Sequence, residues 1–455
     1  MNEILNYISD NKDNFLKELI EFLKIPSISS ISTYKEYMIQ AAKWLSENMK
    51  SAGLKNVRII PTAGHSIVYG EWLEAGPKAP TVLVYGHYDV QPVDPLNLWE
   101  FPPFDPVIKN GKIYARGSAD DKGQLFIHIK AVESFLKTVG KLPVNIKFLI
   151  EGEEEAGSNH LDEFIENNRE MLLCDTVLIS DTEWFAEGKP SICYSLRGIA
   201  FVELTVTGPN RDLHSGTYGG GIDNPLNVLC WMVSKLKDDY GRITIPGFYD
   251  DVRSLTSEER ANFKKLPFDE VEYCKDLDIP MVNGEIGFTT LERVSARPTL
   301  DLNGIYGGYT GEGAKTIIPS KAIAKISMRL VPDQKPDDII NKIEKHLKNL
   351  APPTVKIEIK KLHGGNPVLV PLESKGIKSA VKAFQTAFGK EVLFTREGGS
   401  IPIVSTFLEV LNAPSVLMGM GLPGDNIHSP NENFNIENFF GGIKVSALFL
   451  DEFSK

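Results

Sequence analysis

The sequence predicts an α/β protein with a largely parallel mixed sheet flanked by helices, into which a ferredoxin-like α+β domain is inserted. Two observations support this fold class. Short apolar runs alternate with amphipathic helical segments up to about Pro190 and again after about Leu372. Between these regions the elements follow the order β-α-β-β-α-β, which is typical of a split βαβ unit. A chain of 455 residues is also too long for one core.

The first region begins with two amphipathic helices. Phe15, Leu19 and Leu23 share the apolar face of the first helix, and Pro26 ends it. The second helix runs from about Tyr37 to Met49 and precedes Gly53, a suitable C-terminal cap. A helix over Gln124–Val139 then lies among four expected strands. These strands are Thr81–Tyr85, Lys112–Ala115, Asn145–Ile150 and Thr176–Ile179.

The second region starts with Ile199–Thr207, where apolar residues alternate with small or polar ones as in a half-exposed strand. A polar stretch at about Asp238–Pro298 is too long for a simple loop and indicates an insertion. The remaining elements are a helix at Pro225–Leu236, strands at Thr299–Ile305 and Ile323–Leu330, a helix at Pro336–Leu350 and a strand at Val355–Ile359. Alternation then resumes and ends in a helix at Ile436–Phe453. The expected domains are therefore 1–195 with 372–455, interrupted by 196–371.

Composition excludes several classes of protein. The net charge of −11 argues against a nucleic-acid partner. No apolar run approaches the roughly 18 residues needed to cross a bilayer, so no membrane partner is expected. The N-terminal segment mixes acidic and basic residues, unlike a signal or transit peptide. The four cysteines form no C-x-x-C pair, which is typical of reduced thiols in a cytoplasmic protein.

Four expected strands end in residues that can bind metals. His87 ends the run into GHYDVQP, and Glu155 lies in EGEEEAGS after the strand Asn145–Ile150. Asp181 follows Thr176–Ser180, and the run Ser415–Met420 leads through GLPGDN to His428. Because chemistry collects beyond the carboxyl ends of parallel strands, we expect these side chains to meet at one sheet edge.

With Asp120 from ARGSADDKGQ, these residues form a set of two imidazoles and three carboxylates. Such ligands suit Zn²⁺, with Mn²⁺ or Co²⁺ as alternatives. Five ligands exceed the needs of one catalytic ion and fit two ions roughly 3.5–4 Å apart that share a carboxylate. Asp120, just before a helix, is well placed to be the shared ligand.

Two further acids have expected roles beside the ligands. Asp89 lies two residues after His87 and can accept the second ring N–H of that histidine. Glu154 would point away from its neighbour Glu155 and can act as general base. Spacing alone does not separate Glu154 from Glu153 in this role.

The motifs resemble those of the clan MH metallopeptidases, a family with a zinc-peptidase-like catalytic domain. The family includes cytosolic nonspecific dipeptidase, carnosine dipeptidase, glutamate-type carboxypeptidase and the succinyl-diaminopimelate desuccinylases. The matching pieces extend from about residue 80 to the C-terminus in family order. They are GHYDVQP, ARGSADDKG, EGEEEAGS, LISD, DLHSG, GAKTIIPSK with SMRLVP, HGGNP, REGGSIP and the His428 segment. DLHSG, SMRLVP and REGGSIP are closest to the dipeptidase branch.

The resemblance implies specific roles. One ion would be held by His87, Asp120 and Asp181, and the other by Asp120, Glu155 and His428. Glu154 aligns with the general base, and the Asp120–Asp121 peptide is expected to be cis. His214 would reach the active site of a partner subunit, which makes the inserted domain a dimerisation or lid domain. Positions that would grip the substrate backbone and terminal carboxylate are Arg329, Thr316, Gly399, Ser400 and His363. The segment PGDNI before His428 departs from the shorter Gly/Ala-rich stretch of many dipeptidases, so specificity near it is open.

We therefore expect a cytoplasmic homodimeric dipeptidase with two metal ions per subunit, acting on dipeptides with a free C-terminal carboxylate. One alternative keeps the chemistry and changes the substrate, as in an N-acyl-amino-acid deacylase, a desuccinylase or a glutamate-type carboxypeptidase. Another alternative is a catalytically silent scaffold that has lost its metals. The sequence does not identify the preferred side chains, the physiological metal or the metabolic role.

Overall fold

The computed structural model describes residues 1–399 and 401–455. The chain packs into two compact units. The first comprises Met1–Tyr194, Val370–Thr395 and Thr406–Lys455, and the second comprises Ser195–Leu369 and Arg396–Ser405. The second unit therefore interrupts the first in the sequence. Segment 396–405 packs with the second unit, although the expected boundaries assign it to the first.

Four parallel strands form the centre of the main sheet, adjacent in the order β6-β3-β7-β17. Their bounds are Asn145–Glu151, Thr81–His87, Thr176–Ile179 and Ser415–Leu417. All residues of β6, β7 and β17 are buried, as expected for strands of a sheet covered on both faces. Because the strands are parallel, their carboxyl ends lie at the same edge.

Antiparallel strands flank this parallel centre. β2 (Ile67–Trp72) pairs with β6, and β1 (Lys55–Ile60) pairs with β2. On the other side β8 (Ser191–Leu196) neighbours β17 and pairs with β16 (Leu393–Glu397). The short β15 (Val368–Leu369) pairs with the end of β8. The predicted mixed, largely parallel sheet is confirmed.

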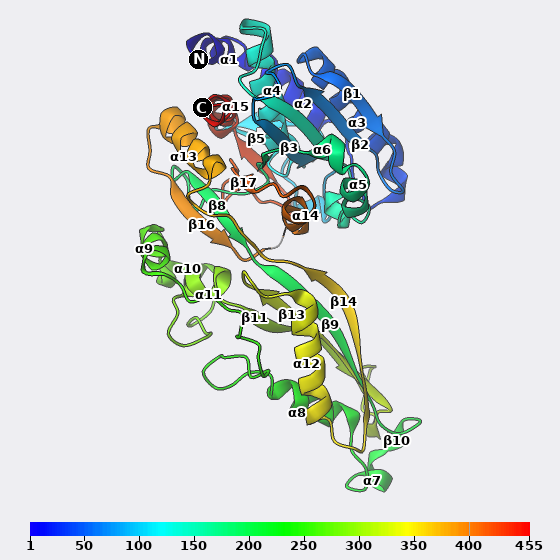
Figure 1. Ribbon diagram of the computed structural model, residues 1–455. Helices are drawn as coiled ribbons and strands as arrows, with labels where there is room; N and C mark the ends of the chain where they lie inside the picture. Colours follow the sequence, from blue (N-terminus) through cyan, green and yellow to red (C-terminus); the bar gives the residue numbers. More distant parts are fainter. Residues whose placement is uncertain (400) are drawn as a thin grey trace. The chain divides into compact units, whose positions relative to one another are not determined.

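Helices pack on both faces of this sheet (Figure 1). A Cβ on Gly86 of β3 would lie 3.1 Å from Leu125 of α4 (Lys122–Thr138). Tyr85, the preceding residue, faces the other side, where Phe407 of α14 (Pro402–Leu411) meets it edge to face at 5.4 Å. The remaining helices of this unit are α1 (Asn2–Asp10), α2 (Lys12–Leu23), α3 (Lys35–Ser51), α5 (Leu161–Asn167), α6 (Arg169–Leu172), α13 (Lys375–Phe388) and α15 (Ile436–Phe453), with single 3₁₀ turns at Ser32–Tyr34, Leu96–Leu98 and Glu154–Ala156.

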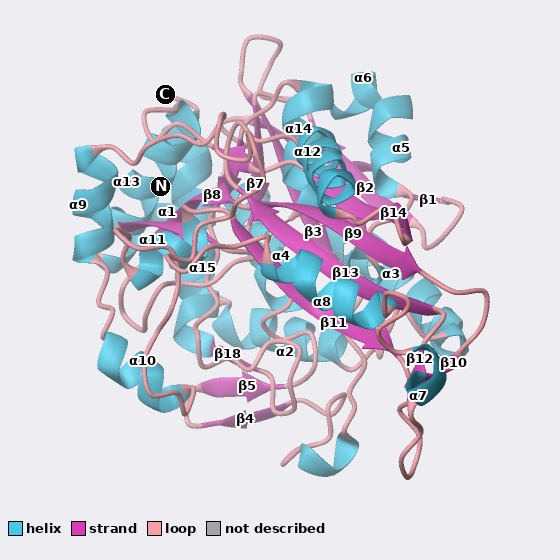
Figure 2. Cartoon of the chain, turned by 90° about the horizontal axis from the view of Figure 1, so that it is seen from below, coloured by secondary structure: helices cyan, strands magenta, loops and turns pink. Residues whose placement is uncertain are grey.

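A small antiparallel sheet lies apart from the main one (Figure 2). Its strands are β18 (Asn433–Asn435), β5 (Lys112–Tyr114) and β4 (Val107–Lys109), in that order. The strand expected at 112–115 therefore forms, but it does not join the main sheet. The pairing of β18 with β5 ties the segment after His428 to the segment before α4.

The second unit contains a four-stranded antiparallel sheet in the order β11-β13-β9-β14. The elements are β9 (Gly198–Thr207), α8 (Pro225–Ser234), β11 (Thr299–Gly307), β13 (Lys321–Leu330), α12 (Pro336–Leu350) and β14 (Lys356–Gly365). Alternate residues of β9 and β13, such as Val202 and Ile326, are buried against Leu229 of α8 and Ile343 of α12. This connectivity and strand order match the predicted ferredoxin-like topology.

The polar insertion of the second unit carries three short helices, α9 (Ser257–Lys265), α10 (Glu270–Asp276) and α11 (Thr290–Ser295). β10 (Leu213–His214) and β12 (Ile317–Ile318) form a separate two-stranded antiparallel sheet, and β10 leads directly into α7 (Ser215–Tyr218). Among the helices of the described residues, none is both long and apolar enough to cross a bilayer.

Candidate active site

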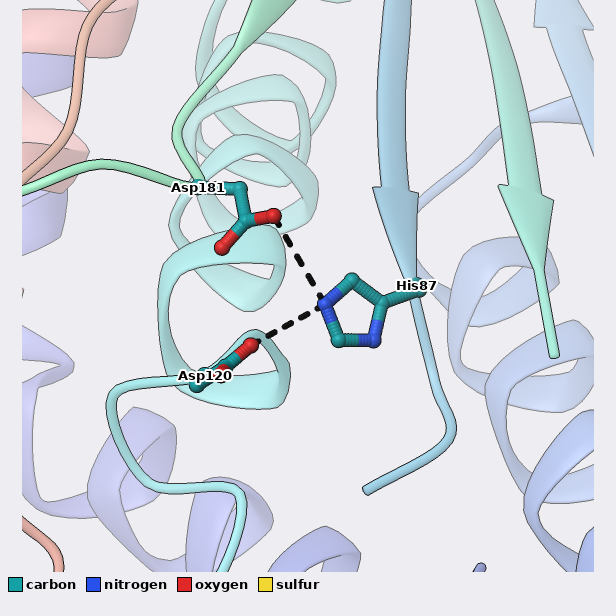
Figure 3. Close-up of side chains that lie close together, drawn as sticks. All are labelled: His87, Asp120 and Asp181. Carbon is teal, nitrogen blue, oxygen red and sulfur yellow. Dashed lines mark ion pairs between the residues drawn. The ribbon is translucent and has the colours of Figure 1, made fainter. Parts of the chain in front are cut away.

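The carboxyl ends of β3 and β7 bring predicted ligands together (Figure 3). His87 is the last residue of β3 and is completely buried. Its Nε2 lies 3.1 Å from Oδ1 of Asp120 and 3.8 Å from Oδ2 of Asp181. Asp181 follows β7, and Asp120 comes from the loop before α4. These three side chains converge on a common point, as metal ligands do.

The other oxygen of Asp120 belongs to a second group. Nε2 of His428 lies 2.8 Å from Oδ2 of Asp120 and 3.3 Å from Oε2 of Glu155. Within each group the three candidate ligand atoms lie within 4.8 Å of one another. The two groups therefore share Asp120, which turns one carboxylate oxygen to each.

The donor set fits two divalent cations. Nε2 of His87 is buried and has no hydrogen-bond partner among the described residues, although Oδ1 of Asp120 is 3.1 Å away. A buried nitrogen in this position would be satisfied by a cation held jointly with the carboxylates. Imidazole nitrogen and carboxylate oxygen are ligands of Zn²⁺, Mn²⁺ and Co²⁺ sites.

The buried carboxyl groups of the cluster would also be stabilised in their charged form by a nearby positive charge. Burial, followed by the neighbouring Asp120, raises the pKa of Asp181 well above its ordinary value. Burial is likewise the main cause that raises the pKa of Asp121 to about 8. Asp120 is the exception, because the imidazoles of His428 and His87 outweigh its burial and lower its pKa. Cations at the two groups would relieve the repulsion among the remaining carboxylates.

Asp120 is positioned by the start of α4. The Asp120–Asp121 peptide is cis, as the resemblance implied. Oδ2 of Asp121 accepts a hydrogen bond from the backbone N–H of His87 at 3.1 Å. The same turn therefore directs one carboxylate to the ligand cluster and uses the next one to hold the end of β3.

Asp89 braces two segments of the site. Nδ1 of His87 lies 3.1 Å from the backbone carbonyl oxygen of Asp89 and 3.4 Å from its Oδ1. The N–H at Nδ1 therefore donates its hydrogen bond to the nearer acceptor, the backbone carbonyl oxygen. Nε2 is then left as the candidate ligand nitrogen. Oδ2 of Asp89 accepts the backbone N–H of Glu155 at 3.0 Å. Its carboxylate thus connects the end of β3 to the acidic turn.

The three consecutive acids differ in environment. Both oxygens of Glu153 face Nδ1 of His160, at 3.2 and 2.9 Å. Burial is the largest cause that raises the pKa of Glu154 to about 7, and nearby Glu155 and Asp120 add to it against the opposing effect of His87. Glu155 faces His428. One turn thus presents an acid in contact with a histidine, an acid with a raised pKa and a candidate ligand.

His428 lies in a loop with left-handed backbone, with φ of 59° at His428 and 64° at Asn431. Side chains hold this loop in place. Oδ2 of Asp425 accepts the backbone N–H of Leu422 at 2.8 Å, and Oδ1 of Asn431 accepts that of Glu100 at 2.6 Å. Asp425 belongs to the unusual PGDNI segment, which therefore shapes the loop that carries the ligand.

The sequence analysis missed Gln91 as a site residue. Its Nε2 donates a hydrogen bond to Oε2 of Glu155 at 2.6 Å, the same oxygen that faces His428. The available signal was its place in GHYDVQP, two residues after Asp89 on an extended segment. A hydrogen bond to a ligand carboxylate fixes the orientation of that ligand.

Two of the predicted substrate contacts lie on one face of the second unit's sheet. Arg329 of β13 is opposite Ile199, and His363 of β14 is opposite Phe201, on the face away from the core residues. Burial and the charge of Arg329 lower the pKa of Arg197 to about 10. Arg197, which the sequence analysis also missed, donates its backbone N–H to the carbonyl oxygen of Gly399 at 3.1 Å. Ser400 lies outside the described residues.

His214 ends β10 and is exposed. Its Nδ1 accepts a hydrogen bond from the backbone N–H of Gly216 at 3.0 Å. In the neutral ring the proton is then on Nε2, which becomes a hydrogen-bond donor. Thr316 lies beside this residue, because its carbonyl oxygen accepts the backbone N–H of Ser215 at 3.1 Å.

Known proteins are similar to this chain along its whole length. The Cys-Gly metallodipeptidase DUG1 of Saccharomyces cerevisiae is 33% identical over 485 residues, covering 100% of this chain and 98% of the relative. The beta-Ala-His dipeptidase of Homo sapiens is 31% identical over 472 residues, covering 100% of this chain and 93% of the relative.

A solved structure extends the similarity to the fold. The M20 family metallo-carboxypeptidase of Sulfolobus solfataricus has a TM-score of 0.84 at 36% identity, and the match covers 97% of this chain and 99% of that chain. The model of peptidase family M20/M25/M40 matches residues 83–452. The resemblance drawn from the motifs is therefore confirmed, and the chain belongs to peptidase family M20/M25/M40.

Proposed function

We propose that this enzyme hydrolyses the peptide bond of dipeptides with two divalent metal ions per subunit. The observation that carries the proposal is the carboxylate of Asp120, which offers one oxygen to the group of His87 and the other to the group of His428. A carboxylate shared in this way suits two ions about 3.5–4 Å apart, the spacing of two-metal hydrolases. Relatives that match along the whole chain are named metallodipeptidase and dipeptidase.

The ligand assignment follows from the two groups. His87, Asp120 and Asp181 would hold one ion, and Asp120, Glu155 and His428 would hold the other. Two imidazoles among carboxylates favour Zn²⁺, and Mn²⁺ or Co²⁺ suit the same donors.

Glu154 is the proposed general base. When bound, the two ions would activate a water molecule and polarise the scissile carbonyl group. Glu154 takes the proton from that water and then passes it to the leaving amine. In the metal-free site, burial is the main cause that raises the pKa of Glu154, which makes this carboxylate a better proton acceptor than an exposed one. Glu153 is the weaker candidate because it is paired with His160.

Residues of the second unit would bind the substrate. A guanidinium suits bidentate recognition of a carboxylate, so Arg329 is assigned to the free C-terminal carboxylate of the dipeptide. Its proximity to Arg197 increases the positive charge available to an anion. Thr316, Gly399, Ser400 and His363 are assigned to the substrate backbone and carboxylate from their motif positions.

The competing activity is that of a carboxypeptidase or an N-acyl-amino-acid deacylase, since one similar solved structure is a metallo-carboxypeptidase. The test compares kcat/KM for Ala-Ala, N-blocked tripeptides, N-acetyl-alanine and N-succinyl-alanine, each with Zn²⁺, Mn²⁺ and Co²⁺. We expect free dipeptides to be the best substrates. Preference for N-blocked tripeptides would identify a carboxypeptidase, and preference for the acylated amino acids would identify a deacylase.

We further propose that the enzyme is a homodimer in which His214 stabilises the oxyanion in the partner's active site. The donor Nε2 of an exposed, backbone-anchored imidazole suits this role. His214→Ala and Glu154→Gln should each be nearly inactive. Mixing them under subunit exchange should restore about a quarter of wild-type activity, because half of the dimers then carry one intact site. An inactive mixture, with exchange demonstrated, would place the action of His214 within its own subunit.

A cytoplasmic location is proposed as well. The four cysteines are widely separated along the sequence and form no C-x-x-C pair. Cysteines in such a pattern are typical of reduced thiols in a cytoplasmic protein. Fractionation of cells that produce the protein, with the activity assay as readout, tests this location.

A further inference from the structure

A buried carboxylate lies beneath the loop that carries Asp120. Glu432 is completely buried and accepts four hydrogen bonds, two at each oxygen. Oε1 accepts the backbone N–H groups of Ala119 and Asp120 at 2.9 and 3.1 Å. Oε2 accepts the backbone N–H of Gly117 at 3.0 Å and Nη1 of Arg116 at 2.8 Å. Every lone-pair direction of this carboxylate is thus directed at one short segment.

Glu432 comes from the same loop as a ligand of the second group. It lies four residues after His428 and directly before β18, which pairs with β5. Its own carbonyl oxygen accepts the backbone N–H of Ala115 at 3.1 Å. Glu432 therefore joins two segments that are more than 300 residues apart. Its hydrogen bond with Asp120, for example, spans 312 positions of the sequence.

Arg116 supplies the charge that makes this burial tolerable. It is 1% exposed, and its Nη2 donates to the carbonyl oxygen of Pro92 at 3.1 Å. Its guanidinium also lies over the ring of Trp99, 5.3 Å from the centroid. The arginine thus neutralises the carboxylate from the side away from Asp120.

We infer that Glu432 is a positioning residue, which holds the backbone of Asp120 so that its two carboxylate oxygens face the two metal groups. The inference rests on the proposed function, because it needs Asp120 to be a shared ligand. A hydrogen bond to the N–H of Asp120 and another to the preceding N–H fix the orientation of the peptide that carries the side chain. Partners of this kind typically change metal affinity by 10- to 100-fold when they are removed.

The test measures Zn²⁺ binding by chelator-stripped enzyme in competition with a chromophoric chelator. Glu432→Gln keeps the shape but replaces one acceptor oxygen by an amide that faces donors. It should weaken at least one of the two Zn²⁺ sites by about 10- to 100-fold. Its kcat should fall while KM changes little, since the substrate contacts are assigned to other residues.

A buried ion pair in the second unit supplies the matched control. Glu285 accepts two hydrogen bonds from Arg297, both at 2.7 Å, and both residues are buried. Glu285→Gln should lower the thermal stability of the enzyme but leave its Zn²⁺ affinity unchanged. Arg116→Lys, which leaves the carboxylate of Glu432 in place, should also lower stability more than affinity.

Unchanged Zn²⁺ affinity in Glu432→Gln would overturn the inference, and so would an equal loss of affinity in Arg116→Lys or Glu285→Gln. If Glu432→Gln does not fold, Glu432→Asp decides by the same criterion, because its shorter side chain cannot reach both pairs of donors. Wild-type enzyme that binds fewer than two Zn²⁺ ions would instead contradict the proposed function. The two failures are therefore distinguishable.

Discussion

Glu154→Gln is expected to stabilise the metal-free protein while it abolishes catalysis. Burial is the main cause that raises the pKa of Glu154 from 4.5 to about 7, with Glu155 and Asp120 adding to it against His87. At pH 8 the folded protein must hold this carboxylate in its charged form. The pKa difference corresponds to about 3 kcal/mol of unfavourable free energy. The neutral amide of glutamine avoids that cost at nearly the same shape.

The sign of the pH dependence follows from linkage. A carboxyl group whose pKa is raised by folding stabilises the protein most below its unfolded pKa of 4.5, and this stabilisation is lost as the pH rises through about 7. The amide does not titrate. The free energy of unfolding of the metal-free variant should therefore exceed that of the wild type by less than about 1 kcal/mol at pH 5 and by about 2–3 kcal/mol at pH 8.

Urea unfolding of chelator-treated protein at pH 5 and pH 8 measures both differences. Glu153→Gln is the control, because the side chain of Glu153 is in hydrogen-bond contact with Nδ1 of His160 and its replacement relieves no such repulsion. The reasoning would be refuted if Glu154→Gln gained the same free energy of unfolding at the two pH values, or if it were less stable than the wild type at pH 8. With metals restored, turnover by Glu154→Gln should be 10²- to 10⁴-fold below wild type.

Three further outcomes are expected. Burial raises the pKa of Asp121 and of Glu151 to about 8, so the stabilisation that each carboxyl group gives is lost as the pH rises through that value. Metal-free wild type should therefore lose about 2–3 kcal/mol of stability per group, or about 5 kcal/mol in all, between pH 6 and pH 9. Urea unfolding with and without Zn²⁺ measures this loss, and a metal-free protein as stable at pH 9 as at pH 6 would contradict it. Arg329→Ala should lose about 10- to 100-fold in kcat/KM on dipeptides and much less on their C-terminal amides; equal losses would make the arginine structural. Gln91→Leu should bind Zn²⁺ about 10-fold more weakly, as measured by chelator competition, since Glu155 loses its hydrogen-bond donor; unchanged affinity would remove Gln91 from the site.

The convergence of His87 and Asp181 was predictable because of the geometry of parallel strands. Short apolar runs before His87 and Asp181 indicate buried strands, and parallel strands end at the same edge of a sheet. Side chains one or two residues beyond such ends must lie near one another, whatever the rest of the fold does. The helix over Ile436–Phe453 was equally predictable, because its bounds are set by local periodicity and the N-cap of Asn435.

Other features depended on contacts that no local pattern encodes. The expected strand at 112–115 pairs with β18, more than 300 residues later, and so belongs to a separate sheet. Glu153 and Glu154 are adjacent in the sequence, and only the neighbouring His160 distinguishes them.

Fold class, the identity of the candidate ligands and the family thus follow from residue types and their periodicity along the chain. Tertiary structure alone decided which oxygen of Asp120 faces each group of candidate ligands, turned Gln91 toward Glu155 and set Glu432 beneath the Asp120 loop. The physical reason is the range of the interactions. Periodicity reports which side of an element is buried, whereas the position of a carboxylate depends on hydrogen bonds of about 3 Å between segments that meet only when the whole chain has folded.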